Sequence, residues 1–342
     1  MNRRTFLRQA SCASLAAVAP AIASEKGYTT PDLANEILGQ GTFRYRANRS
    51  WGRLDHEQHP VKDCHAITKD RAGRILLLTN ETRNNLIAYS LGGEFVASWE
   101  HRFPGAHALE LRDEKGDELC WITDHNISVV SLCTPEGREI RRLEPSVFSA
   151  KYPDPSKYHP TNVAVMPDGD FYISDGYGSS FVHHVDPEWK YISSFGGIGT
   201  EPANLRTPHA VWIDNRSGKS FLLVCDRSNA MLKWFSPAGE LIRIVPLPGA
   251  KPSNVVQLGQ HLAITSLNGM VLILDGADRV VSVVGGDPAN YVEGQLQPLQ
   301  PFNYSLFHPH GLHIEPNGDI YLAQWDSNRT YPLKLERLPV VA

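Results

Sequence analysis

Long apolar runs are missing from this chain of 342 residues. No stretch of 18 apolar residues occurs, which argues against a transmembrane helix. An excess of charge is also missing, because 33 basic and 37 acidic residues leave a net charge of −4. This balance predicts no nucleic-acid partner and no anionic surface as partner. The 42% of hydrophobic residues is nevertheless enough for a globular core.

Helical periodicity is almost absent as well. The chain instead alternates short apolar segments with turn residues, and Asp168-Gly169 and Asn317-Gly318 are typical of two-residue hairpin turns. This pattern predicts an all-β protein.

The N-terminus reads as a targeting segment. Asn2-Arg3-Arg4-Thr5-Phe6-Leu7-Arg8 is a twin-arginine pattern, followed by a mildly apolar stretch and by Ala21-Ile22-Ala23 as a cleavage site. The alternative is a plain cytosolic start that contains two arginines. The first interpretation predicts a signal peptide over residues 1–23 and export of the folded protein to the periplasm or beyond.

Cysteine is scarce, and no Cys-x-x-Cys pair occurs. Cleavage at residue 23 would leave Cys64, Cys120, Cys133 and Cys225. Cys120 and Cys133 flank a turn, so hairpin pairing would place them roughly opposite each other. The sequence leaves open a cross-strand disulfide or two separate buried thiols.

A repeat organises the remainder of the chain. Each copy begins with an apolar strand, passes a turn, and ends a second strand near a polar residue. The copies begin at His65, His107, Thr161, His209, Ser253 and His310. These starts are 42, 54, 48, 44 and 57 residues apart, a period typical of propeller blades. A two-sheet sandwich would also have many short strands, but not six openings in phase.

The fold class predicted is therefore a six-bladed β-propeller. The last copy lacks an outer strand, which the segment around residues 42–46, or its neighbour up to Leu54, could supply to close the ring. We expect an N-terminal lead-in and ring-closing strand in residues 24–59, and the propeller in residues 60–342.

Histidine occupies four of the six repeat starts. The first strand of each propeller blade lines the central channel, so His65, His107, His209 and His310 should form a ring at one mouth. A single such histidine is typical of a hydrogen-bonded structural position. Three or more in one ring indicate a metal site instead, and three neutral imidazoles with an open fourth position suit zinc.

Two further side chains lie near the expected mouth, at second-strand ends. Tyr177 follows Ser174-Asp175-Gly176, and Arg227 follows Val224-Cys225-Asp226. A nearby cation favours the phenolate form of a tyrosine, which can then act as a general base, and an arginine can bind a carboxylate or an oxyanion. The alternatives are a packed aromatic ring and an ion pair within the blade.

These residues resemble the family of peptidyl-α-hydroxyglycine α-amidating lyases, which are NHL-repeat propellers. The likeness covers most of residues 60–330, and its motifs are His159-Pro160-Thr161-Asn162-Val163-Ala164-Val165, Ile173-Ser174-Asp175-Gly176-Tyr177, Pro208-His209-Ala210-Val211 and Val224-Cys225-Asp226-Arg227-Ser228-Asn229. The resemblance implies a six-bladed propeller with zinc on His107, His209 and His310. It also implies a catalytic tyrosine at Tyr177 and a functional arginine at Arg227.

The chain departs from that family at three places. Where the family has a substrate-binding arginine in blade one, this chain has Leu78-Thr79-Asn80, with Arg83 a few residues on. Where the family has a calcium-binding aspartate after its third zinc histidine, this chain has Gly311, which argues against calcium. His65 and His308 are additional histidines near the expected site.

The sequence therefore predicts an exported zinc-dependent enzyme of the amidating-lyase type, which cleaves a C–N or C–O bond of a small molecule or peptide in the central channel. The alternative is a non-catalytic NHL-repeat propeller that binds a ligand or a protein partner. A sugar-lactonase type of site is disfavoured, because the ring is rich in histidine and poor in acids. The substrate and the oligomeric state do not follow from the sequence.

Overall fold

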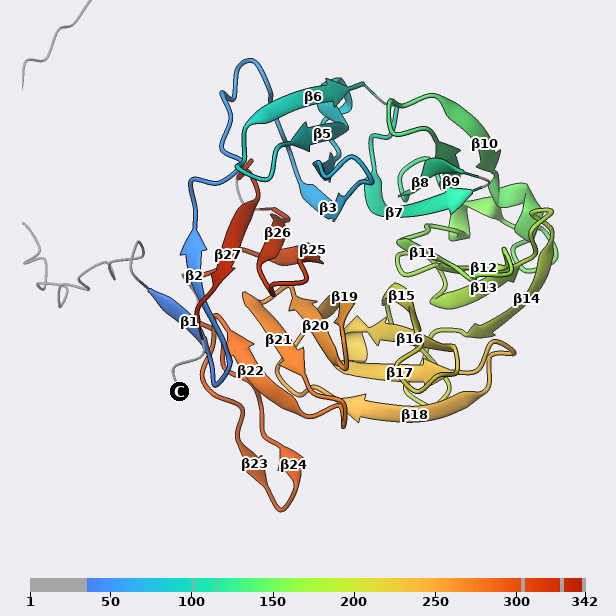
Figure 1. The fold of residues 1–342 in the computed structure, drawn as a ribbon. Helices are drawn as coiled ribbons and strands as arrows, with labels where there is room; N and C mark the ends of the chain where they lie inside the picture. The colour runs from blue at the N-terminus through green and yellow to red at the C-terminus, as the bar shows by residue number, and fades with distance from the viewer. Residues whose placement is uncertain (1–35, 101, 115, 303–304, 327–328, 340–342) are drawn as a thin grey trace, which may run out of the picture. The chain divides into compact units, whose positions relative to one another are not determined.

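The computed structural model describes residues 36–342 except residues 101, 115, 303–304, 327–328 and 340–342. The predicted signal peptide, residues 1–23, lies outside the described residues. Six sheets of at least four strands account for most of the described chain and are arranged as blades around a centre (Figure 1). This confirms the prediction of an all-β six-bladed propeller.

The blades follow chain order, and each begins with its innermost strand. The innermost strands are β3 (Cys64–Lys69), β7 (Ala106–Glu114), β11 (Asn162–Val165), β15 (Pro208–Asp214), β19 (Pro252–Leu258) and β25 (Pro309–Ile314). The second strands are β4 (Ile75–Thr79), β8 (Asp117–Asp124), β12 (Phe171–Ser174), β16 (Phe221–Asp226), β20 (His261–Ser266) and β26 (Ile320–Gln324). The third strands are β5 (Leu86–Tyr89), β9 (Val129–Cys133), β13 (Phe181–Val185), β17 (Met231–Phe235), β21 (Met270–Leu274) and β27 (Leu333–Arg337). The fourth strands of blades one to five are β6 (Phe95–Trp99), β10 (Glu139–Leu143), β14 (Tyr191–Gly196), β18 (Leu241–Pro246) and β22 (Val280–Val284).

Strands from both ends of the described chain close the ring. In blade six the order is β1-β2-β27-β26-β25, with β1 at Ile37–Gln40 and β2 at Phe43–Asn48. Strand β2 pairs antiparallel with β27, and Tyr45 lies opposite Arg337. The predicted closing strand is thus confirmed, and β1 adds a fifth strand that the sequence did not predict. The Gln40 side chain ties β1 to blade five, since it accepts from the Val283 amide at 2.7 Å.

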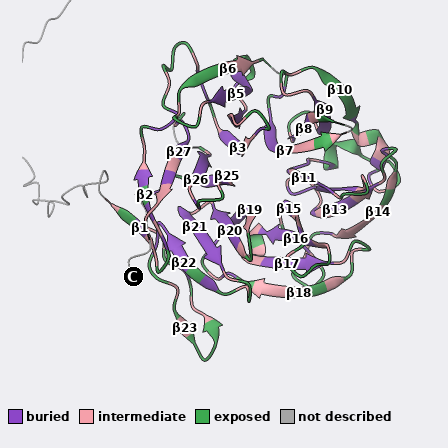
Figure 2. Cartoon of the chain, viewed as in Figure 1, coloured by how far each residue is buried: buried purple, intermediate pink, exposed green. Residues whose placement is uncertain are grey.

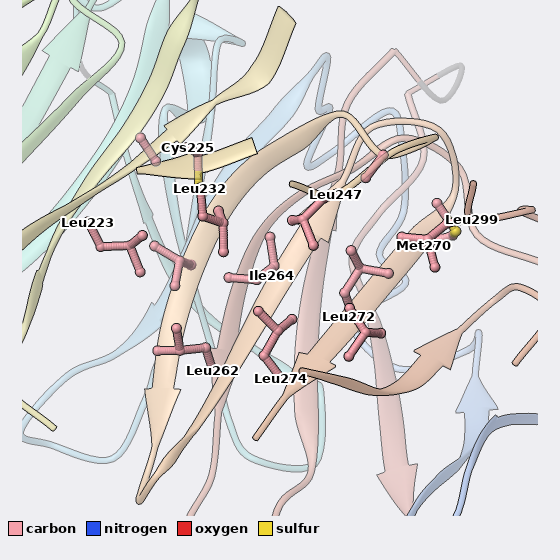
Figure 3. Close-up of a cluster of buried hydrophobic side chains, with 14 of the residues drawn as sticks. Leu223, Cys225, Leu232, Leu247, Leu262, Ile264, Met270, Leu272, Leu274 and Leu299 are labelled. Atoms are coloured by element: carbon pink, nitrogen blue, oxygen red, sulfur yellow. The ribbon is translucent and has the colours of Figure 1, made fainter. Parts of the chain in front are cut away.

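The middle strands are continuous apolar runs because each blade is covered on both faces by its neighbours. Every residue of β4, β9, β21 and β26 is buried, whereas β6, β10 and β18 at the perimeter are mostly exposed or half-buried (Figure 2). Leucine, isoleucine and valine therefore pack between blades rather than in one central core. Figure 3 shows one such layer between blades four and five, where Leu223 and Leu232 approach Ile264 and Leu272.

Elements outside the sheets are short. The described chain has four 3₁₀ turns, Thr82–Asn84, Pro145–Phe148, Pro155–Lys157 and Arg227–Asn229, and a hairpin of β23 (Tyr291–Val292) and β24 (Gln295–Leu296) that projects from the perimeter (Figure 1). Among the described residues no helix is long and apolar enough to cross a membrane. Cys120 lies directly opposite Cys133 on the neighbouring strand, as hairpin pairing predicts. The cysteines of the described chain are free and buried.

Candidate metal centre at the axis of the ring

A β-bulge turns the ring residue of most blades toward the axis. The pairing of the first two strands shifts register at His65, at His107, at His209, at Ser253 and at His310. A bulge adds one residue to one strand and changes the direction of its side chain. These side chains therefore do not follow the alternation by which the other residues of the strand point to one or the other face of the blade. The bulges explain how polar residues at the start of apolar strands reach the ring centre.

A polar side chain at the end of each second strand fixes the segment that leads into the ring residue. The Asp124 carboxylate accepts from the Gly105 amide at 2.9 Å, and Asp175 accepts from His159 at 2.7 Å. The same bond is made in the other blades by Asn80, Asp226, Ser266 and Gln324. The acidic or polar strand ends seen in the sequence therefore anchor the loops at this mouth.

Four histidines meet at the ring centre, and we call His65, His107, His209 and His310 the histidine cluster. The ring centroid of His107 lies 4.8, 4.7 and 4.6 Å from those of His65, His209 and His310. His310 lies 4.6 Å from His65 and 4.8 Å from His209. All four side chains are buried. The convergence predicted from the repeat positions is therefore present in the structure.

The three histidines of blades two, four and six share one hydrogen-bonding pattern. The Nδ1 atoms of His107, His209 and His310 lie 2.6, 2.6 and 2.7 Å from the carbonyl oxygens of Thr161, Ser253 and His65. A carbonyl only accepts, so each Nδ1 carries the proton and each Nε2 presents a bare lone pair. Metal-binding histidines are commonly oriented in this way, by a bond from the other ring nitrogen to a backbone carbonyl.

Burial keeps these imidazoles neutral. Desolvation is the largest cause that lowers the pKa of each histidine of the cluster well below 6.5. Mutual repulsion adds to this effect for His107 and His310. Neutral imidazole is the form that binds a metal ion.

Tyr177 lies between two of these lone pairs. Its hydroxyl oxygen is 3.2 Å from Nε2 of His107 and 3.1 Å from Nε2 of His209, and Arg227 donates to it at 3.3 Å. The Arg227 guanidinium also lies 5.2 Å from the centroid of the tyrosine ring. The structure therefore brings the predicted pair together with the predicted histidines.

The cluster contains more lone pairs than protons. The bare Nε2 atoms of His107 and His209 share one Tyr177 hydroxyl, and the third, on His310, is 3.3 Å from Nδ1 of His65. At most two of the three Nε2 atoms receive a hydrogen bond, and the buried Nε2 of His65 has no partner at all. Each unsatisfied buried acceptor costs about 1–3 kcal/mol, and one divalent cation would satisfy the Nε2 atoms of His107, His209 and His310 together. The donor set fits a metal ion.

One set of metal-binding atoms in the structure differs from the predicted triad by one member. Among the described residues, ligand atoms of His65, His107 and His310 all lie within 4.8 Å of one another. The predicted triad has His209 in place of His65, so both sets share the pair His107 and His310. The assignment of ligands among the four histidines stays a prediction.

The other positions singled out in the sequence contribute no side chain to the histidine cluster. His308 bonds through Nδ1 to the Trp325 carbonyl at 3.1 Å and packs on the Trp325 ring. Arg83 is largely exposed and forms an ion pair with Glu81 at 2.9 Å. A Cβ atom at Gly311 would lie 2.5 Å from the His65 carbonyl oxygen, so this position has no room for the calcium-binding aspartate of the lyases.

His125 is a site residue that the sequence reasoning missed. Its ring centroid is 5.5 Å from that of His107 and 5.2 Å from that of Tyr177, and its Nδ1 donates to the Gly105 carbonyl at 2.9 Å. His125 follows Asp124 at the end of a second strand, as Arg227 follows Asp226. The signal that pointed to Arg227 could therefore have found His125.

Known proteins that are similar to this chain include amidating proteins and an NHL-repeat protein. No family model matches the chain. The mouse peptidyl-glycine α-amidating monooxygenase is 23% identical over 252 residues, which cover 70% of this chain but 24% of the mouse protein. A Caenorhabditis elegans protein, described as a probable peptidyl-α-hydroxyglycine α-amidating lyase, is 22% identical over 67% of this chain and 63% of its own length. Human NHL repeat-containing protein 3 is 22% identical over 82% of this chain and 81% of its own length.

The protein is a six-bladed β-propeller distantly related to the amidating proteins and to NHL repeat-containing protein 3. Solved structures agree on the fold. Virginiamycin B lyase from Staphylococcus aureus superposes with a TM-score of 0.54 at 11% identity, covering 89% of this chain and all of that one. A gluconolactonase from Xanthomonas campestris has a TM-score of 0.55 at 12% identity and covers 85% and 89% of the two chains. At such identities the likeness is one of fold alone.

Proposed function

We propose that this protein is an exported, zinc-dependent lyase that acts on an α-hydroxyglycine-like small molecule or peptide. The observation that carries the proposal is the position of the Tyr177 hydroxyl, within 3.2 Å of two histidine Nε2 atoms and within 3.3 Å of Arg227. The distant relationship to amidating lyases supports the same chemistry. Export rests on the twin-arginine pattern in residues 1–23.

His107, His209 and His310 would hold the metal through Nε2, because their Nδ1 atoms are committed to backbone carbonyls. A zinc ion in such a site polarises a bound oxygen and stabilises negative charge on it. Among the described residues the cluster offers imidazole nitrogens, which suit zinc better than they suit calcium.

Tyr177 is placed to move one proton. In its phenolate form it would take the proton from the substrate hydroxyl, the C–O bond would become a carbonyl as the C–N bond breaks, and the tyrosine would return the proton to the departing nitrogen. The products are an amide and glyoxylate, a carboxylate that carries an aldehyde, and no other reactant is needed. Arg227, which already donates to the phenol oxygen, would stabilise the phenolate or bind the substrate carboxylate.

The experiment combines metal analysis with a turnover assay. We expect the purified mature protein to contain about one zinc per chain, to lose it in His209→Ala, and to release glyoxylate and amide in equal amounts from an N-acyl-α-hydroxyglycine. Zinc at full stoichiometry without turnover would reject this substrate class. A folded protein that binds no metal would reject the enzyme and favour the alternative of a ligand-binding or protein-binding propeller.

A further inference from the structure

His65 breaks a pattern that the other odd-numbered blades keep. At the ring position blades three and five have Thr161 and Ser253, whose hydroxyls donate to the carbonyls of Pro208 and Pro309 at 3.1 and 3.0 Å. Both side chains thereby bond the backbone of the next blade. Blade one has an imidazole at this position, and it points into the histidine cluster.

The contacts of His65 are made with the other histidines. Its ring centroid lies 4.8 Å from His107 and 4.6 Å from His310, and its Nδ1 lies 3.3 Å from Nε2 of His310. The side chain is 2% exposed, and its Nε2 has no hydrogen-bond partner. Nε2 is therefore not committed to another group, and it can carry the ring proton while Nδ1 faces the metal.

The positions of the ring protons decide which nitrogen of His65 can face a bound metal. His310 holds its proton on Nδ1, which donates to the backbone carbonyl of His65 at 2.7 Å, so Nε2 of His310 is an acceptor. Without metal, Nδ1 of His65 is therefore the donor in the contact with that atom. A metal ion on Nε2 of His310 takes this lone pair away. If the His65 proton stayed on Nδ1, it would then point at a cation. If the proton moved to Nε2, Nδ1 would present a lone pair to the metal.

The distance between the two nitrogens suits a shared metal. In a tetrahedral site with metal–nitrogen bonds of about 2.0–2.1 Å, two ligand nitrogens lie about 3.3–3.4 Å apart. The two nitrogens of His65 and His310 are already separated by 3.3 Å.

We propose that His65 is a fourth metal ligand, binding through Nδ1, so that the centre has four imidazoles rather than three and an open position. This deepens the proposed function and rests on it only in placing a metal at the histidine cluster. A substrate or water then binds either as a fifth ligand or by displacing His65. His65 would in this way control access to the metal.

The test compares wild type with His65→Ser, which places at blade one the residue that blade five already has. Both proteins are loaded with cobalt(II) or zinc, the number of imidazole ligands is measured by X-ray absorption, and affinity is measured by competition with a chelator. We expect four imidazoles in wild type and three in the variant. Metal affinity should be lower by at least about 10-fold in the variant, since even the loss of a group that hydrogen-bonds a metal ligand costs about 10–100-fold. Azide should bind the cobalt variant more tightly than the cobalt wild type, because a position has become open.

The matched control is His308→Asn, which removes an imidazole that bonds the Trp325 carbonyl and suits the positive φ of 42° at that position. It should leave ligand number and affinity unchanged. If His65→Ser does not fold, His65→Gln is measured instead. Three imidazoles in wild type, with unchanged affinity in the variant, would overturn the inference. Four imidazoles without turnover would leave it standing and reject the proposed activity.

Discussion

The even-numbered and the odd-numbered blades contribute differently to the ring centre. Blades two, four and six each place a histidine there, whereas blades three and five place a hydroxyl residue whose backbone carbonyl accepts from the preceding histidine. The even blades thus supply lone pairs, and the odd blades fix which nitrogen carries them. Blade one does both, because the His65 carbonyl accepts from His310 while its side chain joins the cluster. A metal site built in this way depends on backbone positions as much as on the ligands.

The largest effect should come from removing an even-blade histidine. In His107→Ala we expect metal content to fall from about one per chain to near zero, because His107 belongs to both candidate triads. Metal analysis after dialysis measures this, with His308→Asn as the control that keeps its metal. A variant that retains full metal content would show that His107 is a structural histidine.

Tyr177→Phe should separate proton transfer from metal binding. The change removes only the hydroxyl that lies between His107 and His209, so we expect turnover to fall by about 10²–10⁴-fold, the usual contribution of general acid–base catalysis. Metal content should stay at one per chain. A turnover rate equal to that of wild type would exclude Tyr177 from the reaction.

Gly311→Ala should disturb the seam between blade six and blade one. The added Cβ would lie 2.5 Å from the His65 carbonyl oxygen and 2.8 Å from the Ala66 Cα atom, so the two inner strands must separate. We expect a loss of about 1–3 kcal/mol in the free energy of unfolding, measured by denaturant titration. Metal affinity should fall as well, since the same carbonyl orients His310. An unchanged midpoint would show that the seam has room to relax.

Blade three offers a test by pH. Burial lowers the pKa of His183 to about 3 and raises that of Asp175 to about 6, and the Tyr152 hydroxyl bonds to both. Between pH 6.5 and 3 the unfolded chain binds the His183 proton and the folded chain does not. This histidine therefore lowers the free energy of unfolding as the pH is lowered. Between pH 6 and 3.9 Asp175 acts in the opposite direction, because its folded form takes the proton first. Asp175→Asn should therefore lose stability more steeply than wild type, by up to about 1.4 kcal/mol per pH unit.

Unfolding curves at pH 7, 6, 5 and 4.5 measure that slope. The cluster histidines contribute with the same sign in both proteins, so the difference between the two profiles reports on Asp175. Parallel profiles would contradict the raised pKa.

Thr161→Val should weaken the contact between blade three and blade four and leave the metal centre unchanged. It removes a hydroxyl that donates to the Pro208 carbonyl and keeps the carbonyl that orients His107. We expect a loss of about 1–3 kcal/mol in the free energy of unfolding with unchanged metal content, and no loss in the exposed control Thr200→Val. A loss of metal would show that the hydroxyl, and not only the backbone, supports the site.

Much of the fold and part of the site could be predicted from local signals. The period of the repeat depends on turn residues and apolar runs within each blade, and the ring histidines stand at equivalent points of that repeat. Strand β1 and the orientation of each imidazole depend instead on partners far away in the chain, such as Gln40 with Val283 or His107 with Thr161. His65 and Ser253 occupy the same place in the repeat and still differ in role, because the Ser253 hydroxyl bonds the Pro309 carbonyl whereas the His65 ring contacts other histidines.

The closure of blade six also bears on the order in which parts of the chain can fold during synthesis. Strand β2 must wait for β27, which leaves the ribosome roughly 290 residues later, and only then does the blade that carries His310 gain its outer edge. Such a long-range pairing is intrinsically slow to form. We therefore expect the histidine cluster to become complete late in folding. A metal ion would then bind to the centre only after the ring has closed. The metal ions available to it would be those of the cell compartment in which folding ends.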